Sequence, residues 1–256
     1  MKIAILVSGN GTGLQAIIDH IRLGVLLNTR IVKIVSNSPT ARALIRGFDA
    51  GIESVFVEGV AGKKYSSSAE RERERLLFDD RVSSMLLRNG VELVICAGFN
   101  QVLSDLFVNR YMNKIMNVHP AYNIEKFGGV GMVGLRVHQA VINTRERISG
   151  CTIHYVNSTI DRGPVIMRAK VPVFVNDTPE RLGDRVSVIE HRTYPKAIQL
   201  HIDKRISVYG NNVILDLGEE WEDDWNRRQE QYIMYQTQMW KRAGKNIDGL
   251  FKHINS

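Results

Sequence analysis

The chain has 256 residues, of which 44% are apolar and 24% are charged, and it contains two cysteines. This composition is typical of a globular protein and excludes a disordered chain, a collagen and a disulfide-stabilised mini-protein. The net charge of +7 favours small anionic substrates, because no run of Lys and Arg is interleaved with aromatic residues as in a nucleic-acid surface. Cys96 and Cys151 lie in apolar runs and are expected to be buried free thiols. With no targeting or membrane-spanning segment, we expect a cytoplasmic protein.

The first half of the chain alternates strand and helix patterns. An apolar strand is predicted at residues 3–7, followed by a glycine-rich loop at residues 9–13 and an amphipathic helix that starts near Leu14. The predicted strands are apolar without alternation, which favours a largely parallel sheet with helices on both faces, in an α/β, Rossmann-like fold. Further strands are predicted at 31–35, 54–57 and 91–97, and helices at 41–50 and 71–88.

The second half begins with a loop at residues 127–134, where four glycines in eight positions are too permissive for an element interior. Strands are predicted at 151–156 and 165–174, and a helix at about 178–200. Because the two strands lie near one another in the chain, we expect them to join the sheet edge as an antiparallel ribbon.

The chain after residue 204 has a different character and is expected to be an extension, with a turn predicted at residues 209–212. Residues 1–204 form one predicted domain, whose two halves divide near residue 112, and residues 205–256 form the extension. Trp221, Trp225 and Tyr232 recur at helical spacing in a polar, net acidic segment, which predicts an amphipathic helix. Its aromatic face would pack on the body or on a second subunit, and we expect a homodimer through these three residues.

The glycine-rich loop is a candidate anion site. It places backbone N–H groups of Gly11, Thr12 and Gly13 at a helix N-terminus, and Thr12 adds a hydroxyl. The alternative is that the glycines only allow the chain to turn. The spacing is not that of the dinucleotide motif, and no acid follows the second strand to bind a ribose diol. A phosphomonoester is therefore favoured over NAD.

Two further positions carry candidate catalytic groups. Asn117 and His119 follow a buried strand two residues apart, so both side chains project to the same side. Asp161 lies in a turn before Gly163-Pro164. Each has a structural alternative, as a satisfied turn residue. Nothing in the sequence has the spacing of a nucleophile elbow or a metal site, so we expect neither a covalent intermediate nor a metal.

Six motifs in a fixed order resemble one family, the phosphoribosylglycinamide formyltransferases, which are folate-dependent enzymes of purine synthesis. Asn-x-His-Pro with Asp-x-Gly-Pro is specific to the folate formyltransferase superfamily, and the opening Ser-Gly-x-Gly points to this branch. The related methionyl-tRNA formyltransferases carry a C-terminal barrel that binds tRNA. The short, net acidic extension of this chain is unsuited to that role. The resemblance covers residues 1–204, through Ser8-Gly9-Asn10-Gly11-Thr12, Ala97-Gly98-Phe99, Asn117-Val118-His119-Pro120, Cys151-Thr152-Ile153-His154-Tyr155-Val156, Asp161-Arg162-Gly163-Pro164 and Glu190-His191.

The resemblance implies a reaction and a catalytic trio. A formyl group moves from N10 of a 10-formylfolate to the glycine amine of glycinamide ribonucleotide, through a tetrahedral oxyanion. Asn117 and His119 would donate to the oxyanion, and His119 would supply a proton. Asp161 would raise the pKa of the histidine and position a proton-carrying water. His154, beside the Asp161 turn, is expected to support the site rather than to catalyse.

The resemblance also implies the contacts of both substrates. The nucleotide phosphate would bind at Gly11, Thr12 and Gly13, and Glu190 would meet the polar groups of the nucleotide. The halves of the domain would then be a nucleotide-binding half, about 1–112, and a folate and catalytic half, about 113–204. Arg75 would face the folate carboxylate. The pterin ring would lie on two segments, namely Gln101, Val102 and Leu103, and the loop Asn157, Ser158, Thr159 and Ile160.

Three departures from the family pattern affect the predicted pockets. Gly13 replaces a common asparagine, Gln101 replaces a frequent arginine, and Ala121-Tyr122-Asn123-Ile124 replaces Ser-Leu-Leu-Pro. The catalytic trio is retained while the wall beside the formyl group differs. The donor is therefore left open between the tetrahydro and dihydro forms of 10-formylfolate.

Two other functions remain as alternatives. The same trio hydrolyses 10-formylfolate in related hydrolases, which usually begin with an extra regulatory domain, whereas here the glycine-rich loop starts at residue 8. The other alternative is a nucleotide-binding module without activity, whose C-terminal helix recruits a partner. Under all three readings the expected ligands are small molecules, with neither a nucleic acid nor a membrane as partner.

Overall fold

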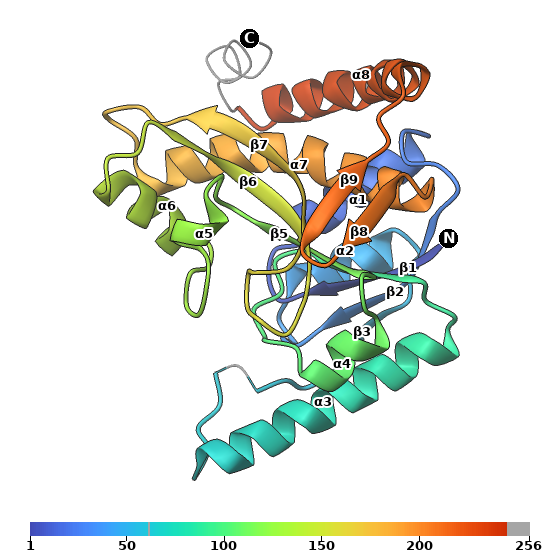
Figure 1. Ribbon diagram of the computed structural model, residues 1–256, viewed down its shortest axis with the longest axis vertical. Helices are drawn as coiled ribbons and strands as arrows, with labels where there is room; N and C mark the ends of the chain where they lie inside the picture. The colour runs from blue at the N-terminus through green and yellow to red at the C-terminus, as the bar shows by residue number, and fades with distance from the viewer. Residues whose placement is uncertain (61, 245–256) are drawn as a thin grey trace. The chain divides into compact units, whose positions relative to one another are not determined.

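The computed structural model, which describes residues 1–60 and 62–244, contains a seven-stranded sheet with the order β3-β2-β1-β4-β5-β6-β7 (Figure 1). The pairs among β1 to β5 are parallel. At the other edge, Tyr155 N donates to Pro164 O and Val173 N to Arg147 O, which is an antiparallel register. The strands are β1 (Lys2–Val7), β2 (Arg30–Ser36), β3 (Ser54–Phe56), β4 (Leu93–Cys96), β5 (Ile115–His119), β6 (Ile148–Tyr155) and β7 (Val165–Pro172).

The expected α/β class is confirmed: the sheet is mostly parallel, helices cover both faces, and the antiparallel edge comes late in the chain. A separate hairpin, β8 (Ile206–Tyr209) with β9 (Asn212–Leu215), replaces what the sequence indicated only as a turn. The helices are α1 (Thr12–Arg22), α2 (Arg42–Asp49), α3 (Ser68–Arg88), α4 (Asp105–Arg110), α5 (Ile124–Phe127), α6 (Leu135–Asn143), α7 (Pro179–Ile202) and α8 (Glu219–Arg242).

The chain divides into two compact units. The first unit comprises Met1–Ile18, Asn28–Val118 and His154–Pro164. The second unit comprises Asp19–Leu27, His119–Ile153 and the described residues from Val165 onward. The domain boundaries expected from the sequence, near 112 and 204, stay predictions, as does the part of the extension beyond residue 244, which lies outside the described residues.

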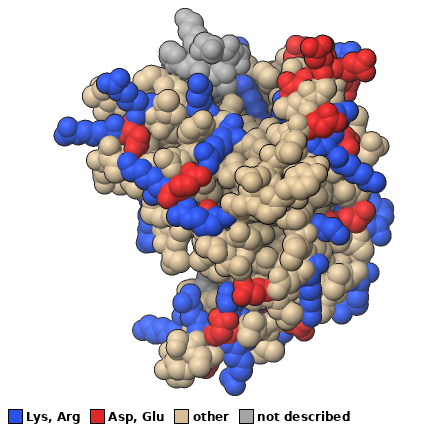
Figure 2. Space-filling view, in the orientation of Figure 1, with Lys and Arg blue, Asp and Glu red and all other residues tan. Residues whose placement is uncertain are grey.

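The core of the first unit lies between the sheet and two helices. All residues of β1 from Ile3 to Val7 are fully buried, as a strand covered on both faces should be. Phe78, Val82 and Leu86 of α3 pack there with Phe107 of α4. Asp79 and Ser83 of α3 are buried as well, whereas its other positions are partly or fully exposed, and Figure 2 shows acidic and basic side chains interspersed over this helix. The alternating Glu and Arg residues at positions 70–75 thus lie on a partly or fully exposed part of this helix.

The aromatic face of α8 packs within the second unit. Trp225 is fully buried, Tyr232 is 3% exposed and Trp221 is 9% exposed. The sequence left two alternatives for this face, the body or a second subunit, and the structure selects the body. The preferred dimer contact through these three side chains is therefore wrong, because they are already buried inside one chain. A homodimer, which stays untested, would need another surface.

Candidate active site

The glycine-rich loop turns between β1 and α1 in the first unit. Gly11 has φ +69°, and a Cβ at this position would lie 2.7 Å from the Cβ of Ala43, so only glycine fits. Gly9 O accepts from Ala43 N at 3.2 Å, which holds the loop against α2. The first N–H groups of α1, at Thr12 and Gly13, have no partners within a helix, so this turn is suited to an anion.

Arg46 of α2 also holds this loop, and the sequence analysis did not find it. Its Nε donates to Asn10 O at 2.8 Å and its Nη1 donates to Gln15 Oε1 at 3.0 Å. The contact arises because β1 and β2 are parallel neighbours, so that the first turns of α1 and α2 lie at the same sheet edge. No motif marks Arg46, and only the pairing of the two strands reveals it.

Asn117 and Asp161 meet at one side chain in the first unit. Val156 N donates to Ile115 O across the antiparallel pair β5 and β6, which places Asn117 opposite His154. Asn117 Nδ2 lies 3.2 Å from His154 Nε2, and His154 Nε2 lies 3.7 Å from Asp161 Oδ1. His154 is therefore the bridge between two of the three residues of the predicted trio.

The proton positions in this cluster follow from the backbone. His154 Nδ1 lies 2.9 Å from Tyr155 O, and a carbonyl only accepts, so Nδ1 carries a proton. In the neutral ring Nε2 then accepts from the amide of Asn117, which fixes the orientation of that amide. When the ring is protonated, Nε2–H faces the carboxylate of Asp161.

The turn that carries Asp161 has a constrained backbone. Asp161 has φ +55°, a left-handed conformation that Asp and Asn adopt more readily than other side chains. A Cβ at Gly163 would lie 1.8 Å from Tyr155 O, so the glycine of Asp-x-Gly-Pro is required by this contact. Asn157 closes the loop, since its Oδ1 accepts from Thr159 N at 3.0 Å and its Nδ2 donates to Arg162 O at 3.3 Å.

The segment 101–103, expected to contact the pterin, is held by inward-facing side chains of the first unit. Gln101 is 7% exposed, and its Oε1 accepts from Val60 N at 2.9 Å, so this side chain faces the protein rather than the expected folate tail. Arg75 Nη1 donates to the carbonyls of Val102 and Leu103 at 3.4 and 3.3 Å. Its Nε also donates to Glu72 at 2.9 Å, which leaves less of its charge for a folate carboxylate.

His119 belongs to the second unit. It is 4% exposed, and its Nε2 lies 2.8 Å from Phe127 O, so Nε2 is the protonated nitrogen of the neutral ring. His138 of α6 is the other buried histidine near it. Burial, and then the charge of His119, lower the pKa of His138 to about 4, which makes His138 neutral at physiological pH.

The departure after His119-Pro120 changes the local structure of the second unit. Asn123 caps α5, because its Oδ1 accepts from Lys126 N at 2.9 Å. Tyr122 is 37% exposed and lies under the guanidinium of Arg168, 5.9 Å from the ring centre. The apolar wall expected in relatives is therefore replaced by a capped helix and a stacked tyrosine.

Glu190 lies on α7 in the second unit. Burial raises its pKa to about 7, so the carboxyl group changes charge in the physiological range. Cys151 of β6 lies nearby: burial, and then the carboxylate of Glu190, raise the pKa of its thiol. Both cysteines are free and buried, as expected.

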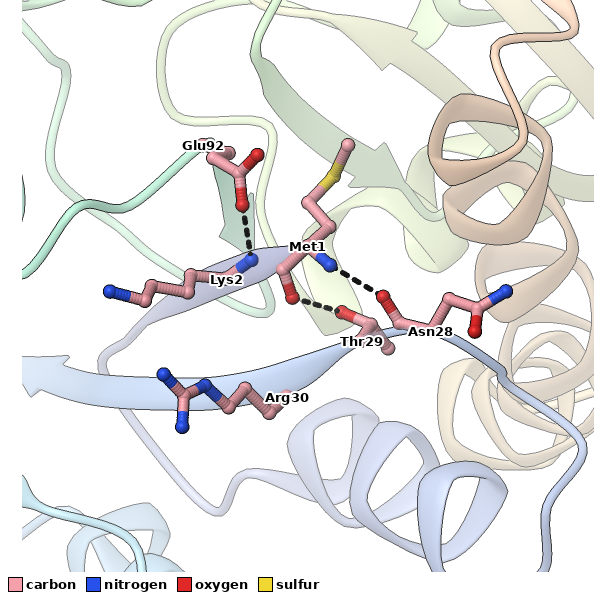
Figure 3. Close-up of a pocket in the computed structure, with 6 residues that line it drawn as sticks. All are labelled: Met1, Lys2, Asn28, Thr29, Arg30 and Glu92. Carbon is pink, nitrogen blue, oxygen red and sulfur yellow. Dashed lines mark hydrogen bonds between the residues drawn. The ribbon is translucent and has the colours of Figure 1, made fainter.

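A separate cavity of the first unit lies at the opposite ends of the strands. Its volume is about 270 Å³, and it is lined by Met1, Lys2, Asn28, Thr29, Arg30 and Glu92 (Figure 3). These residues lie at the starts of β1, β2 and β4, whereas ligands of open α/β sheets bind beyond the carboxyl ends. Among residues 1–60 and 62–244, no helix is long and apolar enough to cross a bilayer, and no set of three His, Cys, Asp or Glu side chains is placed to hold a metal.

Comparisons with known proteins show the family of the chain. The formyl transferase family model matches residues 1–198. The phosphoribosylglycinamide formyltransferase of Haemophilus influenzae is 32% identical over 84% of this chain and 93% of its own length. The crystal structure of glycinamide ribonucleotide transformylase 1 from Symbiobacterium toebii is 33% identical, with a TM-score of 0.73 over 84% of this chain and 94% of that one.

A longer relative is similar over a part of its length only. The trifunctional purine biosynthetic protein adenosine-3 of Gallus gallus is 36% identical over 78% of this chain, which spans 18% of that protein. The likeness to the bacterial enzyme covers nearly its whole length, and the matched residues include all the motifs of the candidate site. The chain therefore belongs to the formyl transferase family, in its phosphoribosylglycinamide formyltransferase branch.

Proposed function

We propose that the chain transfers the formyl group of a 10-formylfolate to the amine of glycinamide ribonucleotide in purine biosynthesis. The observation that carries this proposal is the contact of Asn117 and Asp161 with His154, in a chain that spans 93% of a bacterial formyltransferase. The reaction is an acyl transfer between two nitrogens. It needs donors for a tetrahedral oxyanion and a proton for the leaving folate nitrogen.

Asn117 is the proposed oxyanion donor. One N–H of its amide is directed at His154 Nε2, and this bond fixes the plane in which the second N–H lies. A preoriented donor stabilises a developing negative charge without reorganisation during the reaction. In this proposal His154 orients Asn117 and does not touch the reacting atoms, so it is a positioning residue.

His119 is the proposed proton donor, through a specific nitrogen. Because Nε2–H is committed to Phe127 O, the nitrogen that exchanges a proton with the reactants is Nδ1. Asp161 is the proposed carboxylate of the trio, and it positions the water that carries the proton to the leaving nitrogen. His138 is unsuited to this role because its pKa of about 4 keeps it neutral.

The two substrates are assigned to the remaining groups. The nucleotide phosphate binds at Gly11, Thr12 and Gly13, and main-chain N–H groups replace the amide that Gly13 lacks. Glu190 accepts hydrogen bonds from the polar groups of the nucleotide. The pterin lies on the backbone of residues 101–103 and on the loop 157–160, and Arg75 supports the first of these segments. Asn123 and Tyr122 lie in the segment that departs from the family pattern, so the form of the folate donor is left open. Rates measured with the tetrahydro and the dihydro form of 10-formylfolate will show which of them the chain uses.

One assay separates this function from its alternatives. The chain is incubated with 10-formylfolate, with and without glycinamide ribonucleotide, and the loss of the formyl group is followed by absorbance. We expect deformylation only when the nucleotide is present. Deformylation without nucleotide would indicate a hydrolase, and no reaction in either case would indicate a binding module. The free thiols Cys96 and Cys151 are compatible with the reducing cytoplasm in which we place the reaction.

The pKa of Glu190 predicts a pH dependence of nucleotide binding. The carboxylate form accepts hydrogen bonds, and it becomes dominant as the pH rises through about 7. The KM for the nucleotide should therefore fall about tenfold between pH 6 and pH 8, if only the charged form binds well. Glu190→Gln should have a high KM over the same range with a flatter profile. Titration of the substrate amine affects both proteins alike, so the ratio of the two profiles isolates Glu190.

The same shift predicts an effect on stability with a definite sign. The pKa of Glu190 is raised in the folded state, so the folded chain binds this proton more tightly than the unfolded chain. Stability from this group is full below the unfolded pKa and is lost as the pH rises through about 7. Glu190→Gln should thus raise Tm at pH 8 more than at pH 5. An equal change in Tm at both values, with parallel KM profiles, would contradict the assignment.

A further inference from the structure

The C-terminal helix α8 lies along α7 in the second unit, outside the part of the chain that the family model matches (Figure 1). Its buried face is largely aromatic. Trp225 stacks on Trp221 with ring centres 6.0 Å apart, and Tyr232 lies 3.7 Å from the ring of His20. The acidic first turns of α8 face solvent and are seen as a cluster in Figure 2. One face of α8 is thus fully used within the chain.

Arg192 is the polar centre of the contact between α7 and α8. It is 5% exposed, and its Nε donates to Gln236 Oε1 of α8 at 3.1 Å. Gln229 of α8 donates to the backbone carbonyl of Arg192 at 2.9 Å. Burial lowers the pKa of Arg192 to about 10, which reflects the cost of placing this charge away from water. Removal of an acceptor from such a group is costly.

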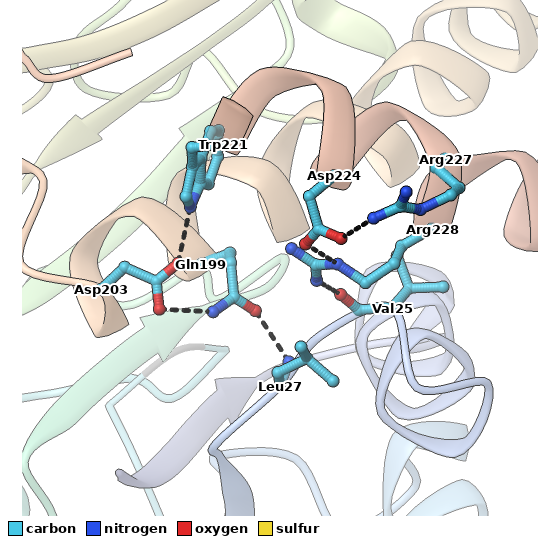
Figure 4. Close-up of polar contacts among 8 residues, drawn as sticks. All are labelled: Val25, Leu27, Gln199, Asp203, Trp221, Asp224, Arg227 and Arg228. Carbon is cyan, nitrogen blue, oxygen red and sulfur yellow. Dashed lines mark hydrogen bonds and ion pairs between the residues drawn. The ribbon is translucent and has the colours of Figure 1, made fainter. Parts of the chain in front are cut away.

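Further polar contacts extend along the same face of α7. Lys196 pairs with Glu222 at 2.6 Å, and Trp221 Nε1 donates to Asp203 Oδ2 at 2.7 Å. Figure 4 shows that Asp203 also accepts from Gln199 and that Arg228 reaches the carbonyl of Val25. The α8 helix therefore holds α7 at several successive turns.

Glu190 lies on the opposite face of α7. At about 100° per residue, Arg192, Lys196 and Asp203 lie within about 40° of one another on the helix, whereas Glu190 lies about 140° from their mean direction and Thr193 lies between the two. Thr193 forms a hydrogen bond with the thiol of Cys151 in β6. The α7 helix is thus the middle of three layers, and its rotation about its own axis sets the position of Glu190.

We propose that α8 is a positioning element for the nucleotide site, which fixes the rotation of α7 through Arg192 and thereby the place of Glu190. This inference rests on the proposed function, in which Glu190 meets the nucleotide. It gives α8 a role in the reaction that requires no contact between α8 and a substrate. Binding of the nucleotide at Glu190 and packing of α8 on Arg192 are then thermodynamically coupled.

The chain contains a natural probe for this coupling. Its three tryptophans, Trp221, Trp225 and Trp240, all lie in α8. Fluorescence excited at 295 nm therefore reports on α8 alone, with no tryptophan near the proposed substrates. We expect a saturable change in tryptophan emission when glycinamide ribonucleotide is titrated into the full chain, with a midpoint near its KM. This measurement requires no variant.

Substitutions at Gln236 test the route through Arg192. Gln236→Leu should raise the KM for the nucleotide about tenfold, with kcat and the KM for the folate within about twofold of wild type. Gln236→Glu keeps an acceptor for the guanidinium and should restore the wild-type KM. Met234→Gln is the matched control, because Met234 is 60% exposed on the same helix and should leave all three constants unchanged.

The outcomes separate this inference from the proposed function. Absence of formyl transfer by the wild-type chain contradicts the function itself. Formyl transfer by Gln236→Leu with a nucleotide KM within twofold of wild type, together with unchanged tryptophan emission on nucleotide binding, overturns only the role of α8. An equal rise of the KM for both substrates would likewise reject a specific effect on Glu190, since it would indicate general loosening of the fold.

Discussion

Replacement of Asp161 by Asn is expected to lower kcat by about 10²–10³-fold, while the KM for the nucleotide stays within about threefold of wild type. The side chain of Asp161 is 11% exposed, so its charge is only weakly screened where it lies 3.7 Å from His154 Nε2. The variant removes this charge and leaves the size of the side chain almost unchanged. The proton-carrying water then loses the carboxylate that we propose positions it, and His154 Nε2 loses the negative charge that it faces.

The backbone makes this substitution a clean one. Asp161 has φ +55°, and Asn tolerates the left-handed region as well as Asp does, whereas Ala would add backbone strain. Asp216→Asn serves as the control, because Asp216 is exposed and pairs with Arg205 at 2.9 Å, away from the residues of the candidate site. Steady-state rates and a nucleotide titration are measured for both variants. A kcat of Asp161→Asn near that of wild type would remove Asp161 from the mechanism.

The sequence predicted those parts of the fold that depend on local pattern. Continuous apolar runs such as residues 3–7 identified buried strands, because a strand covered on both faces has no polar position. The helix α6 was missed, since it begins at Leu135 directly after the glycine-rich stretch and carries no polar cap, as Gly134 precedes it. The hairpin of β8 and β9 was read only as a turn, because each strand has four residues and alternates only between partly buried and exposed positions.

Within the site, pattern identified residue types but not their partners. Asn117, His119 and Asp161 were found because their motifs are short and contiguous. The role of His154 as the bridge depends on the antiparallel register that places it opposite Asn117, which no local pattern encodes. Local pattern also did not show what covers the aromatic face formed by Trp221, Trp225 and Tyr232. An apolar stripe reveals that a helix is covered but not whether the cover is the same chain or another.

Replacement of His119 by Ala is expected to lower kcat by at least about 10²–10³-fold, because the reaction loses both a donor to the oxyanion and its proton source. Binding of the nucleotide should persist, as none of the proposed nucleotide contacts involves His119. Added imidazole should restore part of the rate, since a small base can enter the space left by the ring. The measurement is kcat against imidazole concentration at several pH values.

A structural role for His119 would give a different result. Its Nε2 holds the carbonyl of Phe127, so loss of the ring also loosens the start of the loop after α5. His119→Gln retains an N–H donor for this carbonyl but exchanges no proton. It should therefore be as slow as His119→Ala, and its kcat should not recover the pH profile of the wild type. His138→Gln completes the set. Because the pKa of His138 is about 4, its loss should leave the pH dependence of kcat above pH 6 unchanged, and a lost acidic limb in that variant would transfer the catalytic role to His138.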